Sequence, residues 1–112
     1  MSRKAGIEAE KNAANFLSQK GYRILTTNFT SRMGEIDIIA EKNGRIIFIE
    51  VKMRSSSSFG TGREYVTSKK LQKIILTAQL YMQKNKLTNI PFQIDVVEVQ
   101  GEQFTHLENV TL

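Results

Sequence analysis

The dipeptide Asn43-Gly44 constrains the fold of this 112-residue chain more than any other feature. It lies between two apolar runs, 35–41 and 45–54, and both of its residues accept the positive φ angles of a type I′ turn. The two runs are therefore predicted to form a β-hairpin with a two-residue loop. Because the loop length fixes the register, it also predicts which residues face each other across the hairpin.

This register decides which side chains share a face. One face, which carries Ile36 and Ile38, is expected to be wholly apolar. The other face is apolar near the loop but charged at its far end, where Asp37 lies opposite Glu50 and Lys52 follows two residues later. Because both faces are apolar near the middle, the hairpin is expected to be covered on both sides.

The rest of the chain predicts two helices and further strands. The expected elements are a helix at 3–20, a strand at 22–29, the two hairpin strands, a helix at 67–86, a strand at 92–99 and a weak strand at 103–107. The main order is α-β-β-β-α-β, which predicts an α/β fold with a mixed β-sheet flanked by helices. We expect one domain over residues 1–112, because a second domain would leave neither half a workable core.

Composition narrows the class of protein. The absence of Cys excludes disulfides and thiolate metal sites, and no apolar run approaches the roughly 20 residues that cross a bilayer. The amino terminus also lacks the apolar stretch of a signal peptide, so we expect a cytoplasmic protein with no membrane partner. A net charge of +5 favours an anionic partner such as nucleic acid, although many basic proteins have none.

The opposed acids Asp37 and Glu50 are the strongest functional signal. At about 5 Å and an effective dielectric near 20, two carboxylates repel by roughly 3 kcal/mol. A sheet keeps such a pair if one acid is protonated or a cation lies between them, and Mg²⁺ suits one or two carboxylates with a substrate phosphate. With Lys52 beside them, these groups match metal-assisted phosphodiester hydrolysis. A surface ion pair between Lys52 and Glu35 is the simpler alternative, but it leaves the opposed acids unexplained.

The segment from Asp37 to Glu50-Val51-Lys52 resembles the PD-(D/E)xK nuclease motif, although Ile36 stands where the motif has proline. Over nearly its whole length the chain resembles the YraN-like uncharacterised protein family. The residues that carry this resemblance are Gly6, Glu10, Ala13, Leu17, Gly21-Tyr22, Asn28, Gly34-Glu35-Ile36-Asp37, Glu50-Val51-Lys52, Arg54, Phe59-Gly60, Lys70 and Asp95-Val96-Val97.

The resemblance implies a restriction-endonuclease-like fold, similar to that of archaeal Holliday-junction resolvases. It also implies that Glu10 joins the site, as an amino-terminal glutamate does in those relatives. From spacing alone, Glu10 falls within an apolar stripe formed by Ile7, Ala14 and Leu17. Its carboxylate can either reach the site or tilt to water and interact with the helix dipole.

Basic residues could extend the site into a nucleic-acid surface. Lys69, Lys70 and Lys73 crowd the start of the second predicted helix, where cations oppose the helix dipole. With Arg54 and Arg63 they are predicted to form a rim that contacts phosphates. The alternative is an ordinary solvated helix face.

The first functional hypothesis is a Mg²⁺- or Mn²⁺-dependent nuclease acting on structured or branched DNA. Asp37, Glu50 and Glu10 would bind the metal, and Lys52 would activate water or hold a phosphate. The resemblance to resolvases, which act as dimers because two symmetric cuts need two sites, also implies a homodimer. The alternatives are a non-catalytic nucleic-acid-binding module of the same fold, and a scaffold that contacts a protein partner through 55–65.

Overall fold

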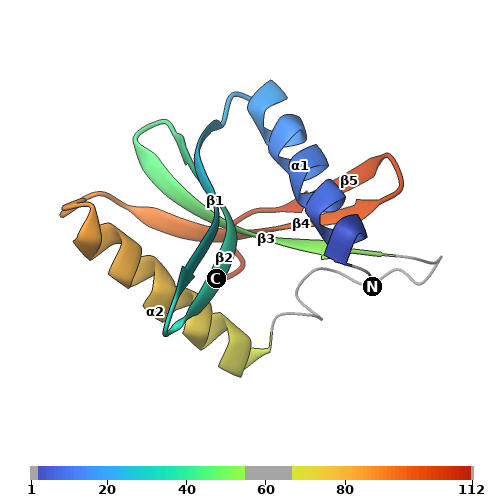
Figure 1. Cartoon of the computed structure of the whole chain (residues 1–112). Helices are drawn as coiled ribbons and strands as arrows, with labels where there is room; N and C mark the ends of the chain where they lie inside the picture. The colour runs from blue at the N-terminus through green and yellow to red at the C-terminus, as the bar shows by residue number, and fades with distance from the viewer. Residues whose placement is uncertain (1–2, 55–66, 112) are drawn as a thin grey trace.

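The computed structural model describes residues 3–54 and 67–111, with side chains from residue 6 onward. The segment 55–65, considered above as a protein-contacting surface, lies outside the described residues. The elements are α1 (Arg3–Gln19), β1 (Arg23–Ser31), β2 (Gly34–Lys42), β3 (Arg45–Met53), α2 (Ser68–Lys84), β4 (Phe92–Gln100) and β5 (Gln103–Leu107), as shown in Figure 1.

The five strands form one sheet in the order β1-β2-β3-β4-β5. Only β3 and β4 are parallel, because α2 carries the chain back between them, and the other neighbours are antiparallel. The predicted α/β class with a mixed sheet is therefore confirmed. The weak strand expected at 103–107 is also confirmed and forms one edge of the sheet.

The predicted hairpin joins β2 and β3. Asn43 has φ 54° and Gly44 has φ 77°, as a type I′ turn requires. Ile38 pairs with Ile49 and Lys42 pairs with Arg45, which is the register predicted from the turn.

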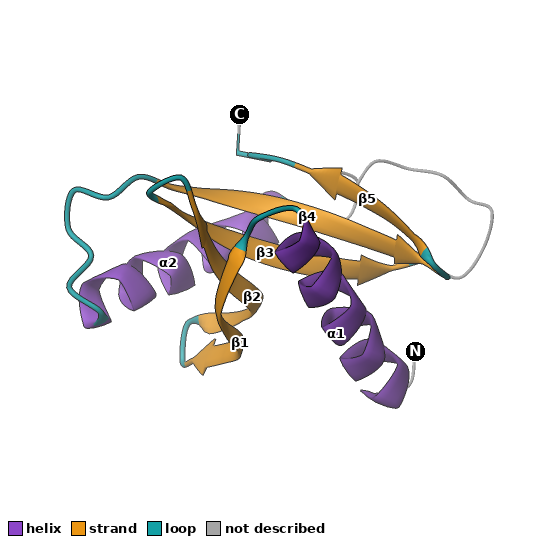
Figure 2. Ribbon diagram, turned by 90° about the horizontal axis from the view of Figure 1, so that it is seen from above, coloured by secondary structure: helices purple, strands orange, loops and turns teal. Residues whose placement is uncertain are grey.

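The two helices cover opposite faces of the sheet. Seen from above, α1 lies in front of the sheet and α2 passes behind it (Figure 2). The buried side chains that pack with α1 are Ala9, Ala13, Leu17, Tyr22, Ile38, Ala40, Ile47, Ile49, Val97 and Val99. Those that pack with α2 are Ile36, Ile39, Ile46, Phe48, Ile74, Ala78, Met82, Ile94, Val96 and Val110. Neither described helix has the length and apolar character needed to span a membrane.

Helix α1 presents a different side to the sheet from the one expected. Ala9, Ala13 and Leu17 are buried, whereas Ile7 is 49% exposed. The predicted stripe was wrong at Ile7, because hydrophobicity alone favoured the larger side chain while the helix packs through two alanines. Because α1 faces the sheet through Ala9, Ala13 and Leu17, Glu10 lies at the border of the buried side of the helix and not within it.

Strand β2 changes face at Asp37, which the register did not predict. Ile36 packs in the α2 cluster, although simple alternation places it with Ile38 in the α1 cluster. On the neighbouring strand β1, Asn28 has φ 54°, and the ladder skips the Asn28–Asp37 pair. The positive φ interrupts the pleat at this level, so the expected continuous apolar face of β2 was wrong at Ile36.

A buried polar network fastens β5 to the rest of the molecule. Asp95 is fully buried in β4, and its Oδ2 lies 2.7 Å from Nε2 of His106. Lys20 Nζ donates to Nδ1 of His106 at 2.7 Å, so Nε2 carries the ring hydrogen and donates to Asp95. The other Asp95 oxygen accepts from the Gln93 side chain and from the Asn109 backbone N–H. His106 is therefore a structural residue that links β5, β4 and the end of α1.

Candidate active site

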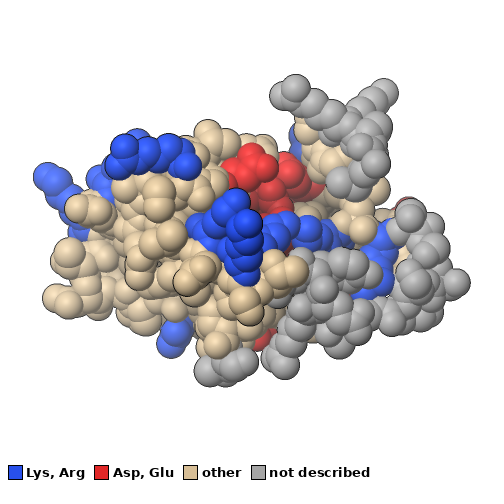
Figure 3. Space-filling model, turned by 90° about the horizontal axis from the view of Figure 1, so that it is seen from below, with Lys and Arg blue, Asp and Glu red and all other residues tan. Residues whose placement is uncertain are grey.

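An open cleft of about 500 Å³ lies between the start of α2 and the end of the β2–β3 hairpin away from its turn. Its lining residues are Gly34, Glu35, Asp37, Glu50, Thr67, Lys69, Lys70, Lys73 and Ile74. Seen from below, acidic side chains gather in the middle of the face with lysine and arginine side chains beside them (Figure 3). The cleft thus combines oxygen ligands for a cation with positive groups for an anion.

Asp37 lies where both of its neighbouring ladders are interrupted. The regular β2–β3 pairing ends at Ile38 and Ile49, and beyond it the Val51 N–H donates to the Asp37 side-chain Oδ2 at 2.8 Å. Asn28 interrupts the ladder on the other side. The Asp37 carboxylate therefore takes the place of a backbone acceptor, so the strands part at the acids.

The expected neighbourhood of Asp37 and Glu50 is present. Glu50 is largely buried, with 12% of its side chain exposed. Its pKa is raised to about 7, first because burial disfavours the charged form and then because the Asp37 carboxylate repels it. The charges of Lys70 and Lys52 act in the opposite direction. An acid with this pKa takes up or releases a proton readily near neutral pH.

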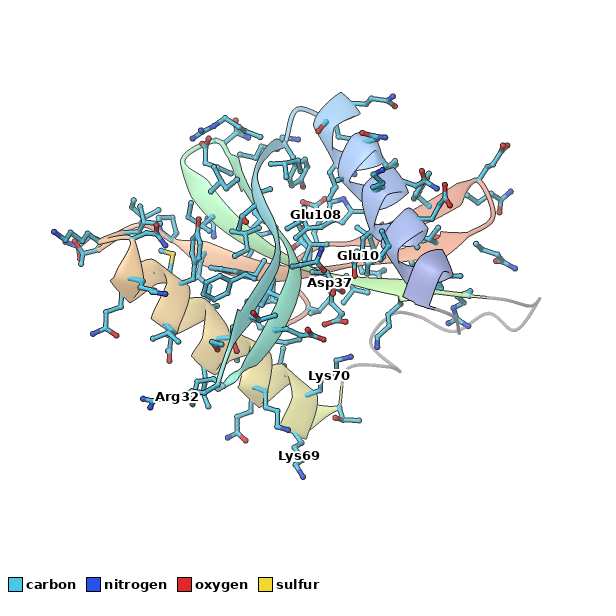
Figure 4. The ribbon with its side chains drawn as sticks, in the orientation of Figure 1. Glu10, Arg32, Asp37, Lys69, Lys70 and Glu108 are labelled. Atoms are coloured by element: carbon cyan, nitrogen blue, oxygen red, sulfur yellow. The ribbon has the colours of Figure 1, made fainter. Side chains whose placement is uncertain are left out.

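Glu10 reaches the same acids from α1. In Figure 4 its side chain lies beside Asp37, although the two residues come from different elements. Burial, followed by the charge of Asp37, raises the pKa of Glu10, while a hydrogen bond from Asn28 opposes the rise. Asn28 thus has two roles, since its backbone interrupts β1 and its side chain contacts Glu10. Asn28 is among the residues that carry the YraN-like resemblance, but no local pattern marks it as a site residue.

Two lysines share the Glu50 carboxylate. Lys70 Nζ lies 3.3 Å from Glu50 Oε1, and Lys52 Nζ lies 3.9 Å from the same oxygen. Burial, followed by contact with Lys70, lowers the pKa of Lys52. Burial acts to lower the pKa of Lys70 too, but contact with Lys52 and the charge of Glu50 raise it overall. The simpler alternative, an ion pair between Lys52 and Glu35, is not formed among the described side chains, where Lys52 pairs with Glu50.

The residues expected on the basic rim occupy different environments. Lys69 and Lys73 are exposed and line the cleft, as a rim requires, whereas Lys70 belongs to the acid cluster. Arg54 is not on an exposed rim, because its side chain is only 6% exposed and its Nε lies 2.7 Å from Glu98 Oε2. No local sequence pattern predicts this ion pair, because Glu98 lies 44 residues away on β4. Arg63 lies outside the described residues.

The donor set suits a cation that needs few protein ligands. Among the described side chains, no group of three or more His, Cys, Asp or Glu is arranged to hold a metal ion. The acids instead form two contacting pairs, Glu10 with Asp37 and Asp37 with Glu50. Mg²⁺ commonly uses one or two carboxylates and completes its shell with waters and substrate phosphate. The crowded Asp37–Glu50 pair fits this kind of ligation, whereas a closed cage of protein ligands is not present in this part of the chain.

Fold and site together define a class: a small α/β protein in which acids from a helix and a β-hairpin meet lysines at an open cleft. The chain belongs to the uncharacterised protein family UPF0102, whose model matches residues 9–99. This range contains all of the acids and lysines of the cluster, and it confirms the YraN-like resemblance.

Relatives from distant bacteria match the chain over most of its length. A UPF0102 protein of Sulfurihydrogenibium sp. (strain YO3AOP1) is 45% identical over 89% of this chain and 87% of its own. One from Clostridioides difficile (strain 630) is 47% identical over 96% of both chains. One from Sulfurimonas denitrificans is 43% identical over the full length of both. The chain therefore spans 87% or more of the length of each of these relatives.

Proposed function

We propose that this protein is a metal-dependent nuclease with a restriction-endonuclease-like fold, which hydrolyses phosphodiesters of structured or branched DNA. The observation that carries the proposal is the contact between Asp37 and the largely buried Glu50, with two lysines on the same carboxylate at an open cleft. A fold stabilised only by packing gains nothing from two opposed acids at this depth. The mixed sheet covered by a helix on each face agrees with the proposed fold.

Each residue of the site has a distinct role in this proposal. Asp37 and Glu50 supply oxygen ligands, and Glu10 approaches from α1 as a third carboxylate. When bound there, Mg²⁺ or Mn²⁺ would polarise the phosphodiester and lower the pKa of a bound water. Lys52, whose pKa is lowered, is suited to orient that water and to exchange a proton with it.

The charge distribution supports nucleic acid as the substrate. The chain carries a net charge of +5, and the exposed Lys69 and Lys73 stand beside the cleft that contains the acids. Cations that surround an acidic metal site can hold the phosphates on either side of the scissile bond. The preference for branched DNA follows from the resemblance to Holliday-junction resolvases, which also suggests a homodimer.

Cleavage of defined DNA substrates tests the proposal. Excess protein is incubated with labelled four-way-junction, supercoiled and linear duplex DNA in Mg²⁺, Mn²⁺ or EDTA, and single-turnover rates are measured. We expect cutting of the junction with either cation and none in EDTA. Asp37→Asn, Glu50→Gln and Lys52→Ala should each slow cutting by about 100-fold or more, while junction affinity is retained.

The matched control is Glu8→Gln, which removes an exposed glutamate from the same helix as Glu10. It should cut like the wild type, whereas Glu10→Gln should not. Rates that stay unchanged in all three acid variants would show that any cutting arises from a contaminant.

One observation favours the second candidate, a nucleic-acid-binding module without catalysis. The ammonium groups of Lys70 and Lys52 already offset the charge of Glu50, so a metal ion is not required to balance it. Under this alternative the wild type binds junction DNA with every cation and never cuts it. In that case Asp37→Asn and Glu50→Gln would tighten binding, because each removes negative charge near the DNA.

A further inference from the structure

The three lysines at the start of α2 do not form one set. Lys69 and Lys73 are exposed, whereas Lys70 is partly buried and contacts Glu50. In Figure 4 the Lys70 side chain extends from α2 toward Asp37, and Lys69 extends away from it. Helical geometry explains the difference, because consecutive residues point about 100° apart.

Lys70 is also better placed toward the cleft than Lys52. Lys70 lines the cleft, whereas Lys52 is not among the described residues that line it. The Lys70 ammonium lies 3.3 Å from Glu50 Oε1, and the Lys52 ammonium lies 3.9 Å from that oxygen. The Lys70 side chain is also the more exposed of the two, at 37% against 26%. An anion entering the cleft therefore meets Lys70 first.

From these positions we infer that Lys70 is a phosphate-contacting residue of the active site, which holds a non-bridging oxygen of the scissile phosphodiester. This inference rests on the proposed nuclease function and adds a second lysine to its site. An ammonium group has three N–H donors. The contact with Glu50 Oε1 uses one of them, which leaves donors for the phosphate oxygen.

The fold holds Lys70 at a fixed distance from the acids. Its own backbone N–H donates to the Thr67 hydroxyl at 3.1 Å, which caps the first turn of α2. About two turns later, at Thr77, α2 packs closely on β2 at Gly34. A Cβ added to Gly34 would lie 3.2 Å from Thr77 Oγ1, so the close approach of strand and helix depends on the missing side chain. A lysine on such a framework loses little conformational freedom when it binds.

Three methionine variants that each remove one positive charge test the inference: Lys70→Met and, as controls at the far end of α2, Lys84→Met and Lys86→Met. Methionine keeps an unbranched side chain and removes the charge, so all three change the net charge equally. We expect Lys70→Met to lower the single-turnover cleavage rate on saturating junction DNA by about 100-fold. Lys84→Met and Lys86→Met should stay within about threefold of the wild type, and Lys70→Arg should recover part of the rate.

A second measurement needs no cleavage. Inorganic phosphate is titrated into the wild type and each variant in EDTA, and backbone amide shifts around the cleft are followed by NMR. We expect shifts that saturate in the millimolar range for the wild type, Lys84→Met and Lys86→Met, and their loss in Lys70→Met. The amide spectra also show whether each variant is folded. Equal phosphate binding by all four folded proteins would overturn the inference and leave Lys70 as a counter-ion of Glu50.

The two proposals fail in different ways. If the wild type cuts and Lys70→Met cuts equally fast, the role of Lys70 is wrong and the nuclease stands. If the wild type never cuts but phosphate shifts vanish in Lys70→Met, the nuclease is wrong and Lys70 still binds phosphate.

Discussion

Glu50 is subject to opposing interactions within the described site. Burial and the adjacent Asp37 disfavour its charge, and Lys70 and Lys52 favour it. The balance leaves its pKa near 7, so the protonation state of this one side chain changes across the pH range in which proteins are usually handled. A group whose pKa differs between the folded and unfolded states makes the free energy of unfolding depend on pH.

The free energy of unfolding should therefore fall as pH rises from about 4.5 to about 7. The ordinary pKa of glutamate is 4.5 and the folded-state pKa of Glu50 is about 7. Between these values the folded protein holds a proton that the unfolded chain has lost, so this stability is lost as pH rises through the folded pKa. Glu50→Gln should remove the decline and stabilise the metal-free protein at pH 8 by up to roughly 3 kcal/mol, at about 1.4 kcal/mol per pKa unit.

Urea unfolding in EDTA at several pH values measures this effect. Glu102→Gln, in the exposed β4–β5 turn, is the control and should keep the wild-type pH profile. Mg²⁺ added at pH 8 should then raise the stability of the wild type but not of Glu50→Gln, by mass action on the folded state. Identical pH profiles for the wild type and Glu50→Gln would show that folding does not raise the pKa of Glu50.

At the scale of elements, the irregularity of β1 at Asn28 is the feature that most affects the geometry of the site. A strand residue at φ 54° breaks the pleat, and the neighbouring β2 changes face at the same level. Asn tolerates the left-handed region better than other non-glycine residues, because its short polar side chain can hydrogen-bond locally. Asp37 leaves both of its ladders at this level, whereas Glu50 stays paired with Val96 of β4, so the irregularity is part of how the cleft is built.

Paired substitutions isolate the backbone strain at this position. Asn28→Gly and Asn28→Ala both remove the amide that contacts Glu10, but only alanine is strained at positive φ. We therefore expect Asn28→Ala to be less stable than Asn28→Gly by about 1 kcal/mol in urea unfolding.

The neighbouring exposed residue Thr27 provides the control, since its φ is not positive. At this regular strand position the order should reverse, and Thr27→Ala should be more stable than Thr27→Gly. Alanine that is equal to or better than glycine at position 28 would mean that β1 straightens there in solution.

At the scale of the whole molecule, the chain carries a net charge of +5, and two exposed lysines, Lys69 and Lys73, border the cleft. Replacing Lys69 and Lys73 together with alanine should weaken DNA binding with little dependence on sequence. For every phosphate that the protein no longer neutralises, the slope of log K against log salt should flatten by about 0.9. Cleavage at saturating DNA should be unchanged, because neither lysine contacts the acid cluster.

Binding titrations at several salt concentrations measure this slope. The double variant Lys84→Ala and Lys86→Ala removes the same charge from the far end of α2 and serves as the control. It should leave the slope near the wild-type value. Equal flattening by both double variants would show that DNA responds to total charge and not to a surface around the cleft.

Sequence alone determined the features that depend on short stretches of chain. The turn preference of Asn43-Gly44 was sufficient for the β2–β3 hairpin and its register, and period-two alternation was sufficient to bring Glu50 and Lys52 together. Helix and strand order followed from hydrophobic period in the same way. These predictions succeeded because turn chemistry and side-chain alternation act between residues that are close along the chain.

Only the tertiary structure decided which distant residues meet at the acids. Lys70 could not be separated from Lys69 by composition or spacing, because its role depends on the angle at which α2 packs on β2. The burial of Arg54 depends likewise on Glu98, and the position of Glu10 depends on which side of α1 faces the sheet. Such contacts arise from the packing of whole elements, where small side chains and one strained backbone angle outweigh the local pattern.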